Sequence, residues 1–83
     1  MNITEARVLA TLAPGGHLSA AQIADSANIT TRAARRAIGY LAYSGFIVTR
    51  VGIRPGTWTL TRYGRAYVET PTGRALIDVP AGA

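Results

Sequence analysis

The sequence predicts a mainly α fold with a small β-hairpin, in the α+β class. Three features predict it: a short segment with strong helix-capping signals, a longer amphipathic segment two residues after it, and two β-branched runs around a loop rich in glycine and proline. The chain has 83 residues, which suits one domain. Its apolar share of 48% favours a folded globule over a disordered segment.

A first helix is expected from about Thr4 to Ala13. Asn2 or Thr4 can cap it, and Glu5 near its start suits the positive end of the helix dipole. Helical spacing predicts an apolar stripe made of Val8, Leu9 and Leu12. The run Pro14-Gly15-Gly16 then ends the helix.

The second helix has the strongest local signature. Ser19 is an N-cap residue, and Gln22 stands three positions later, which is the spacing of a capping box. The helix is expected to continue to about Ala27 and to stop at Asn28, a residue type that tolerates the left-handed conformation.

A third helix is expected from the cap Thr30 to about Ser44, with Gly45 as its stop. Helical geometry at 100° per residue separates two faces. The inner face is small and aliphatic: Ala34, Ala37, Ile38 and Leu41. The outer face is basic and aromatic and consists of Arg32, Arg36, Gly39 and Tyr43. Arg35 and Tyr40 lie at the borders of this face.

Two strands and a fourth helix follow. Residues 46–50 are β-branched and bounded by glycine, residues 57–60 alternate as their partner, and a hairpin loop with Arg54 at its tip joins them. Trp58 is expected in the core. Thr61 caps a short helix from Arg62 to about Glu69. We expect residues 71–83 to form a tail or short strand, with a possible dimer contact, because Pro71-Thr72-Gly73 breaks the chain.

Charge is distributed unevenly. The net charge is +5, and no lysine contributes to it. Seven arginines and no carboxylate lie between Asp25 and Glu69: Arg32, Arg35, Arg36, Arg50, Arg54, Arg62 and Arg65. One positive field over a helix and a neighbouring hairpin is typical of a nucleic-acid-binding protein. Arginine also suits bidentate contacts to phosphate and guanine, although a GC-rich genome explains the missing lysine equally well.

The order of these elements resembles the winged helix-turn-helix domain of bacterial transcription regulators of the MarR and PadR type. The stretch LSAAQIADSANITTRAARRAIGYLAYSGFIVTR is similar to the helix-turn-helix and first wing strand, and WTLTRYGR to the segment after the wing. The resemblance covers about residues 3–69, within a domain placed at 1–70. The sequence departs from this resemblance in two features: we expect neither the long terminal dimerisation helices nor a ligand-binding domain within these 83 residues.

The resemblance implies binding to double-stranded DNA by a recognition helix at 30–44 and a wing at 50–57. The implied contact residues are Thr30, Thr31, Arg32, Arg35, Arg36 and Tyr40 in the helix, and Arg50 and Arg54 in the wing. We expect Arg32 and Arg36 to read bases, and Arg35 and Thr31 to hold the phosphate backbone. Tyr40 and Tyr43 either bind phosphate or cover the groove between helix and wing.

Other classes of function find little support in the sequence. The chain has no cysteine, its four carboxylates are spaced neither as a metal site nor as an acid/base pair, and its serines lie in no nucleophile motif. We therefore expect no enzymatic activity, no metal and no cofactor, and a cytoplasmic, nucleoid-associated protein without a signal peptide or membrane span. The alternative function is a winged-helix protein-interaction module that docks an acidic partner. Recognition of RNA ends is a weaker third possibility.

Overall fold

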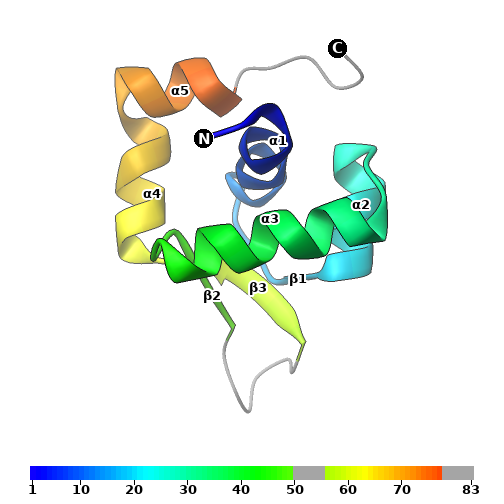
Figure 1. The fold of residues 1–83 in the computed structure, drawn as a ribbon. Coiled ribbons are helices and arrows are strands. Elements are labelled where there is room, and N and C mark those ends of the chain that lie inside the picture. The colour runs from blue at the N-terminus through cyan, green and yellow to red at the C-terminus, as the bar shows by residue number, and fades with distance from the viewer. Residues whose placement is uncertain (50–55, 78–83) are drawn as a thin grey trace.

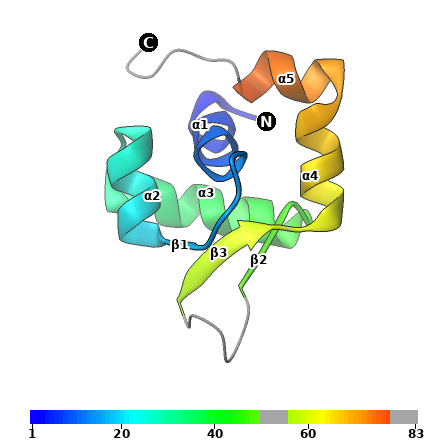
Figure 2. The ribbon, with the colours of Figure 1, turned by 180° about the vertical axis from the view of Figure 1, so that it is seen from behind.

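The computed structural model describes residues 1–49 and 56–77, and its fold is mainly helical with a small antiparallel sheet (Figure 1). Within these residues the helices are α1 (Ile3–Leu12), α2 (Ala20–Ala27), α3 (Thr31–Tyr43), α4 (Arg62–Glu69) and α5 (Pro71–Ile77). The strands are β1 (Leu18–Ser19), β2 (Ile47–Thr49) and β3 (Thr57–Leu60). Viewed from both sides, the β2–β3 hairpin projects away from the helices (Figures 1 and 2).

Capping boxes begin α1 and α2. The Asn2 side chain accepts from the backbone N–H of Glu5 at 2.8 Å, and the Glu5 carboxylate accepts from the backbone N–H of Asn2 at 3.0 Å. Ser19 and Gln22 form the same reciprocal pair at 3.1 and 2.8 Å. The predicted capping box of the second helix is confirmed, and Asn2 rather than Thr4 caps the first.

A turn in which one residue is left-handed connects α2 to α3. Asn28 has φ of 58°, and the next N–H, that of Ile29, donates to the carbonyl oxygen of Ala24 at 3.0 Å. Thr30 then caps α3 by accepting from the N–H of Ala33 at 3.1 Å. The bounds predicted for both helices are therefore confirmed to within one residue.

The core lies where the apolar stripes of the first three helices meet. All residues predicted for the stripe of α1 and for the inner face of α3 are buried. The largest side chains with almost no exposed surface are Val8, Leu9, Leu12, Ile23 and Leu41. Trp58 is half-buried and packs against this core, which agrees with the prediction.

The sheet has three strands in the order β1-β3-β2, so the predicted two-stranded hairpin is incomplete. Ile47 pairs with Leu60 as expected for the hairpin, but Leu18 also pairs with Trp58 on the other edge of β3. Strand β1 has only two residues, and its partner lies far away in sequence. For this reason local periodicity gave no sign of it.

The junction from α3 through β2 to α4 is built around Thr61. Its hydroxyl donates to the carbonyl oxygen of Gly45 at 2.6 Å, and its oxygen accepts from the N–H of Gly64 at 2.9 Å. A Cβ atom on Gly64 would overlap the carbonyl oxygen of Phe46, so the first turn of α4 lies directly on this backbone. The Phe46 ring stacks on Tyr63 with ring centroids 5.1 Å apart.

Residues 71–77 form α5, which corrects the expected tail or short strand. Pro71 is the first residue of the helix, a position where its missing N–H costs nothing. Thr70 accepts from the N–H of Gly73 at 2.9 Å, as an N-cap does, and donates to the carbonyl oxygen of Tyr67 at 2.7 Å. Helix α5 contacts both α4 and α1, so this segment belongs to the packed fold.

Candidate nucleic-acid interface

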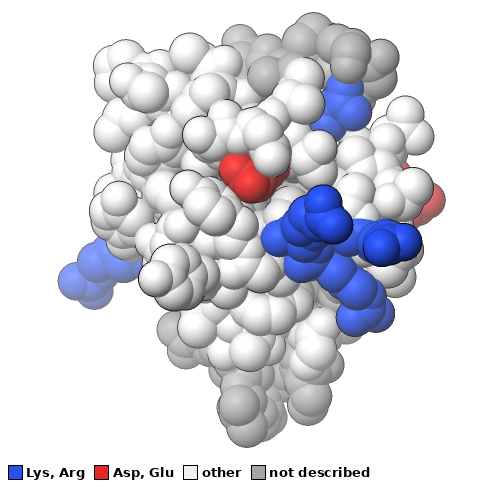
Figure 3. Space-filling view, in the orientation of Figure 1, with Lys and Arg blue, Asp and Glu red and all other residues white. Residues whose placement is uncertain are grey.

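The N-terminal half of α3 presents a cluster of basic side chains (Figure 3). Arg32, Arg35 and Arg36 are all exposed, as the helical faces predicted. Among the described residues none of the three guanidinium groups has a hydrogen bond or ion pair. Their charges are therefore not neutralised within this part of the chain.

The start of α3 adds a second source of positive potential. Thr30 and Thr31 are exposed, and the free N–H groups of the first turn together with the helix dipole favour an anion there. The Thr30 hydroxyl oxygen already accepts from Ala33, so this side chain stabilises the helix and has only its hydroxyl hydrogen left to donate.

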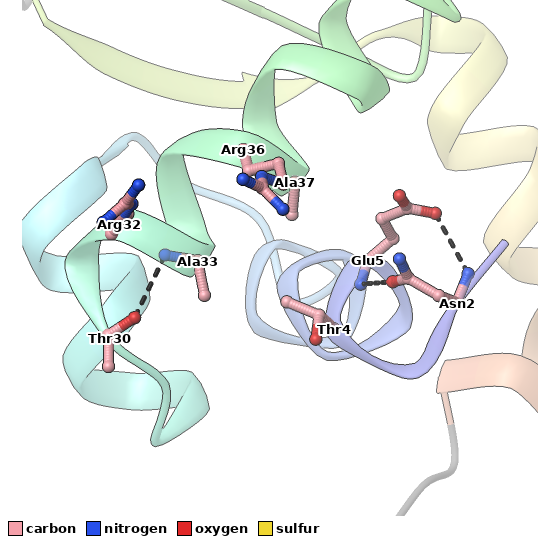
Figure 4. A pocket seen from close by; sticks show the side chains of 8 residues that line it. All are labelled: Asn2, Thr4, Glu5, Thr30, Arg32, Ala33, Arg36 and Ala37. Carbon is pink, nitrogen blue, oxygen red and sulfur yellow. Dashed lines mark hydrogen bonds between the residues drawn. The ribbon is translucent and has the colours of Figure 1, made fainter.

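A hollow of about 330 Å³ lies between the first turn of α1 and the first two turns of α3 (Figure 4). Arg32 and Arg36 line it from α3, and Glu5 lines it from α1. In the space-filling view, acidic groups lie on two sides of the basic cluster, one over α1 and one at the edge over α2 (Figure 3). Glu5 is the sole carboxylate of α1, and Asp25 is the sole carboxylate of α2. No carboxylate lies among these arginines along the chain, but the fold brings that of Glu5 to the edge of the basic cluster.

A second, smaller hollow of about 230 Å³ borders the opposite side of α3. It is lined by Arg35, Ile38 and Gly39 from α3, by Ala20 from α2 and by Trp58 from β3. The exposed face of α3 thus stands between two depressions, one toward α1 and one toward β3.

The two tyrosines of α3 differ in exposure. Tyr43 is 92% exposed, so it does not cover a groove, which corrects one of the two roles considered for it. Tyr40 is 46% exposed and lies on the shoulder of the helix, as expected.

The remaining arginines are distributed differently. Arg50 and Arg54, the expected wing contacts, lie outside the described residues. Arg62 and Arg65 are exposed on α4. The basic group over the start of α4 is separate from the cluster on α3 (Figure 3), so the arginines on this face do not form one continuous field.

Sequence reasoning missed the contribution of α1 to this surface, namely Asn2, Thr4 and Glu5. These residues are distant from α3 in sequence, and their capping pattern signals only a helix start. The packing of α1 against α3 brings them to the hollow, and no local pattern reports that packing.

Within residues 1–49 and 56–77, no group of three or more His, Asp or Glu side chains could hold a metal ion, and no helix is long and apolar enough to cross a membrane. Comparisons with protein families, curated proteins and solved structures find no match to this chain.

Proposed function

We propose that this chain is a small winged helix-turn-helix protein that binds double-stranded DNA and regulates transcription in the cytoplasm. The observation that carries the proposal is the cluster of Arg32, Arg35 and Arg36, which are exposed and have no partner among the described residues. Repulsion among these three positive charges raises the free energy of the free protein, and contacts with phosphates or base edges would lower it.

The order of elements supports the fold assignment. Helix α2, a tight turn and α3 follow one another as in a helix-turn-helix, and the β2–β3 hairpin projects beside α3 as a wing does (Figure 1). Strand β1 completes a three-stranded sheet around β3, which anchors the hairpin to the start of α2.

The shape of the exposed face supports insertion of α3 into the major groove. This groove is about 12 Å wide and admits one α-helix. The hollows on the two sides of α3 leave space for the groove walls, while Arg32 and Arg36 would reach the base edges. Arg35 and Thr31 would then contact phosphates, and Tyr40 would add a hydrogen bond.

We also propose Arg50 and Arg54 as wing contacts, because of their positions in the sequence. They belong to the segment that joins β2 to β3. A homodimer is part of the proposal because one domain of this size covers only a half-site.

Fluorescence anisotropy with a labelled random-sequence duplex at several salt concentrations tests the proposal. If about five arginines neutralise phosphates, log K should fall against log salt with a slope of about −4.5. The decisive variant replaces Arg32, Arg35 and Arg36 by Gln. Its control replaces Arg62, Arg65 and Arg74, which are also exposed and carry the same total charge.

We expect the α3 variant to lose at least tenfold in affinity at moderate salt, and its slope to become shallower by about 0.9, because Arg35 is the one arginine of the three assigned to a phosphate. The control should lose less. Equal losses in the two variants would exclude α3 as the main interface, and no binding of the wild type at low salt would exclude the function.

A second candidate function, the docking of an acidic protein partner, is favoured by the exposed aromatic rings at the junction of α3 and α4. Tyr43 is 92% and Tyr63 60% exposed, and Arg62 is next to Tyr63. Aromatic and arginine side chains are enriched at protein interfaces. This candidate predicts that Tyr43→Ser leaves duplex binding unchanged, and it becomes the leading one if the wild-type protein binds no duplex.

A further inference from the structure

We infer that Glu5 is a specificity-determining residue of the α3 interface: its carboxylate keeps DNA phosphates away from the Arg32–Arg36 side of α3, so that these arginines contact base edges instead. The inference rests on the proposed DNA binding. It concerns a residue outside the helix that would enter the groove.

Glu5 lines the same hollow as Arg32 and Arg36, and it is the single carboxylate among the lining residues: Asn2, Thr4, Glu5, Thr30, Arg32, Ala33, Arg36 and Ala37. Its position is fixed, because its carboxylate accepts from the backbone N–H of Asn2 at 3.0 Å as part of the capping box. Figure 4 shows this carboxylate on the α1 wall and both arginines on the α3 wall.

The carboxylate does not neutralise the arginines by direct contact. Within the described ranges, Glu5 has no ion pair with Arg32 or Arg36, so all three charges stay available to a ligand. Because Glu5, Arg32 and Arg36 line the same hollow, their charges act on the same ligand. A ligand that enters the hollow therefore meets positive and negative charge together.

This mixture of charges discriminates between the two parts of DNA that an arginine can bind. A phosphate carries a full negative charge and is repelled by Glu5. A G·C base pair offers guanine acceptors to arginine and a cytosine amino donor, which a carboxylate can accept. The hollow thus disfavours the backbone and tolerates the base edge, and exclusion of the competing contact is a general route to specificity.

The test compares Glu5→Gln with Glu69→Gln. Glutamine at position 5 can still accept in the capping box, so the helix start is preserved while the charge is removed. Glu69 is exposed at the end of α4, and its replacement changes the net charge by the same amount. Anisotropy is measured on a random duplex and on a duplex obtained by in vitro selection with the wild-type protein, at several salt concentrations.

We expect Glu5→Gln to bind the random duplex about threefold to fivefold more tightly, with a steeper salt slope and a smaller gain on the selected duplex. The ratio of the affinity for the selected duplex to the affinity for the random duplex therefore falls. Glu69→Gln should leave this ratio unchanged. A purely structural role of Glu5 would change the thermal midpoint and leave the ratio as it is.

Thr4→Glu tests the inference in the opposite direction. Thr4 lines the same hollow, and a carboxylate in the first turn of α1 suits the helix dipole. The variant should weaken binding to the random duplex and raise the ratio. If both Glu5→Gln and Thr4→Glu leave the ratio unchanged while the wild type binds DNA, the role of Glu5 is refuted and the proposed function stands. If the wild type binds no duplex, both fail together.

Discussion

The hydroxyl of Thr61 donates to the carbonyl oxygen of Gly45 at 2.6 Å across the end of α3 and the start of α4. The same oxygen accepts from the N–H of Gly64 at 2.9 Å, so one side chain both caps α4 and ties it to the preceding helix. Thr70 and Gly73 repeat this arrangement at the start of α5, with Tyr67 supplying the carbonyl oxygen. The spacing Thr-x-x-Gly thus serves twice as a junction between successive segments.

Thr61→Val should destabilise the fold by about 1–2 kcal/mol. The substitution keeps the shape of the side chain but removes the cap of α4 and the hydrogen bond to Gly45. Thr49→Val is the control, because Thr49 is exposed on β2 and valine suits a strand. Urea denaturation of both variants measures the difference, and equal midpoints would contradict the junction role of Thr61.

Gly64→Ala should destabilise the fold by about 1–3 kcal/mol or more, since the added methyl group would overlap the Phe46 carbonyl oxygen. Gly39→Ala should have the opposite effect and stabilise it by about 0.5–1 kcal/mol. Gly39 lies within α3, and a Cβ atom there would meet nothing within 4 Å. Thermal unfolding followed by circular dichroism compares the two. A destabilised Gly39→Ala protein would show that this helical position has a neighbour the structure does not contain.

Asn28→Gly should leave stability unchanged or raise it slightly, whereas Asn28→Ala should lower it by about 1 kcal/mol. The cause is the φ of 58° at this position, which alanine adopts at a cost and glycine freely. The measurement is the free energy of unfolding in urea. If alanine were tolerated as well as glycine, the left-handed turn between α2 and α3 would not be required.

Arg36→Ala should lower the ratio of selected-duplex to random-duplex affinity, at a cost of about 1–3 kcal/mol on the selected duplex. Arg35→Ala should weaken both duplexes about equally and make the salt slope shallower by about 0.9. The two arginines are adjacent and both exposed, so each variant is a control for the other. Equal losses on both duplexes for Arg36→Ala would remove its assignment as a base-reading residue.

The sequence predicted the elements whose signals are local. The caps Ser19, Thr30 and Thr61 and the stop at Asn28 are each decided by a few neighbouring residues, and the structure places them as expected. The apolar faces of α1 and α3 followed from helical periodicity in the same way. The same periodicity was sufficient to predict the exposed basic face of α3.

Features that depend on distant residues were missed. Strand β1 exists because Leu18 meets Trp58, forty positions later in the chain. Pro71 was interpreted as a breaker, although after a capping threonine it begins α5. Glu5 was expected only at the start of α1, and its place beside the arginines of α3 was not predicted, because that place depends on the packing of α1 against α3.

Strand β1 also decides how this small protein can open. Ser19 is both a residue of β1 and the cap of α2, so separating β1 from β3 would disturb the first turn of that helix at the same time. The edge of the sheet and the start of α2 should therefore exchange their amide hydrogens as one cooperative unit. A force applied to β3 would be transmitted through β1 to the first turn of α2.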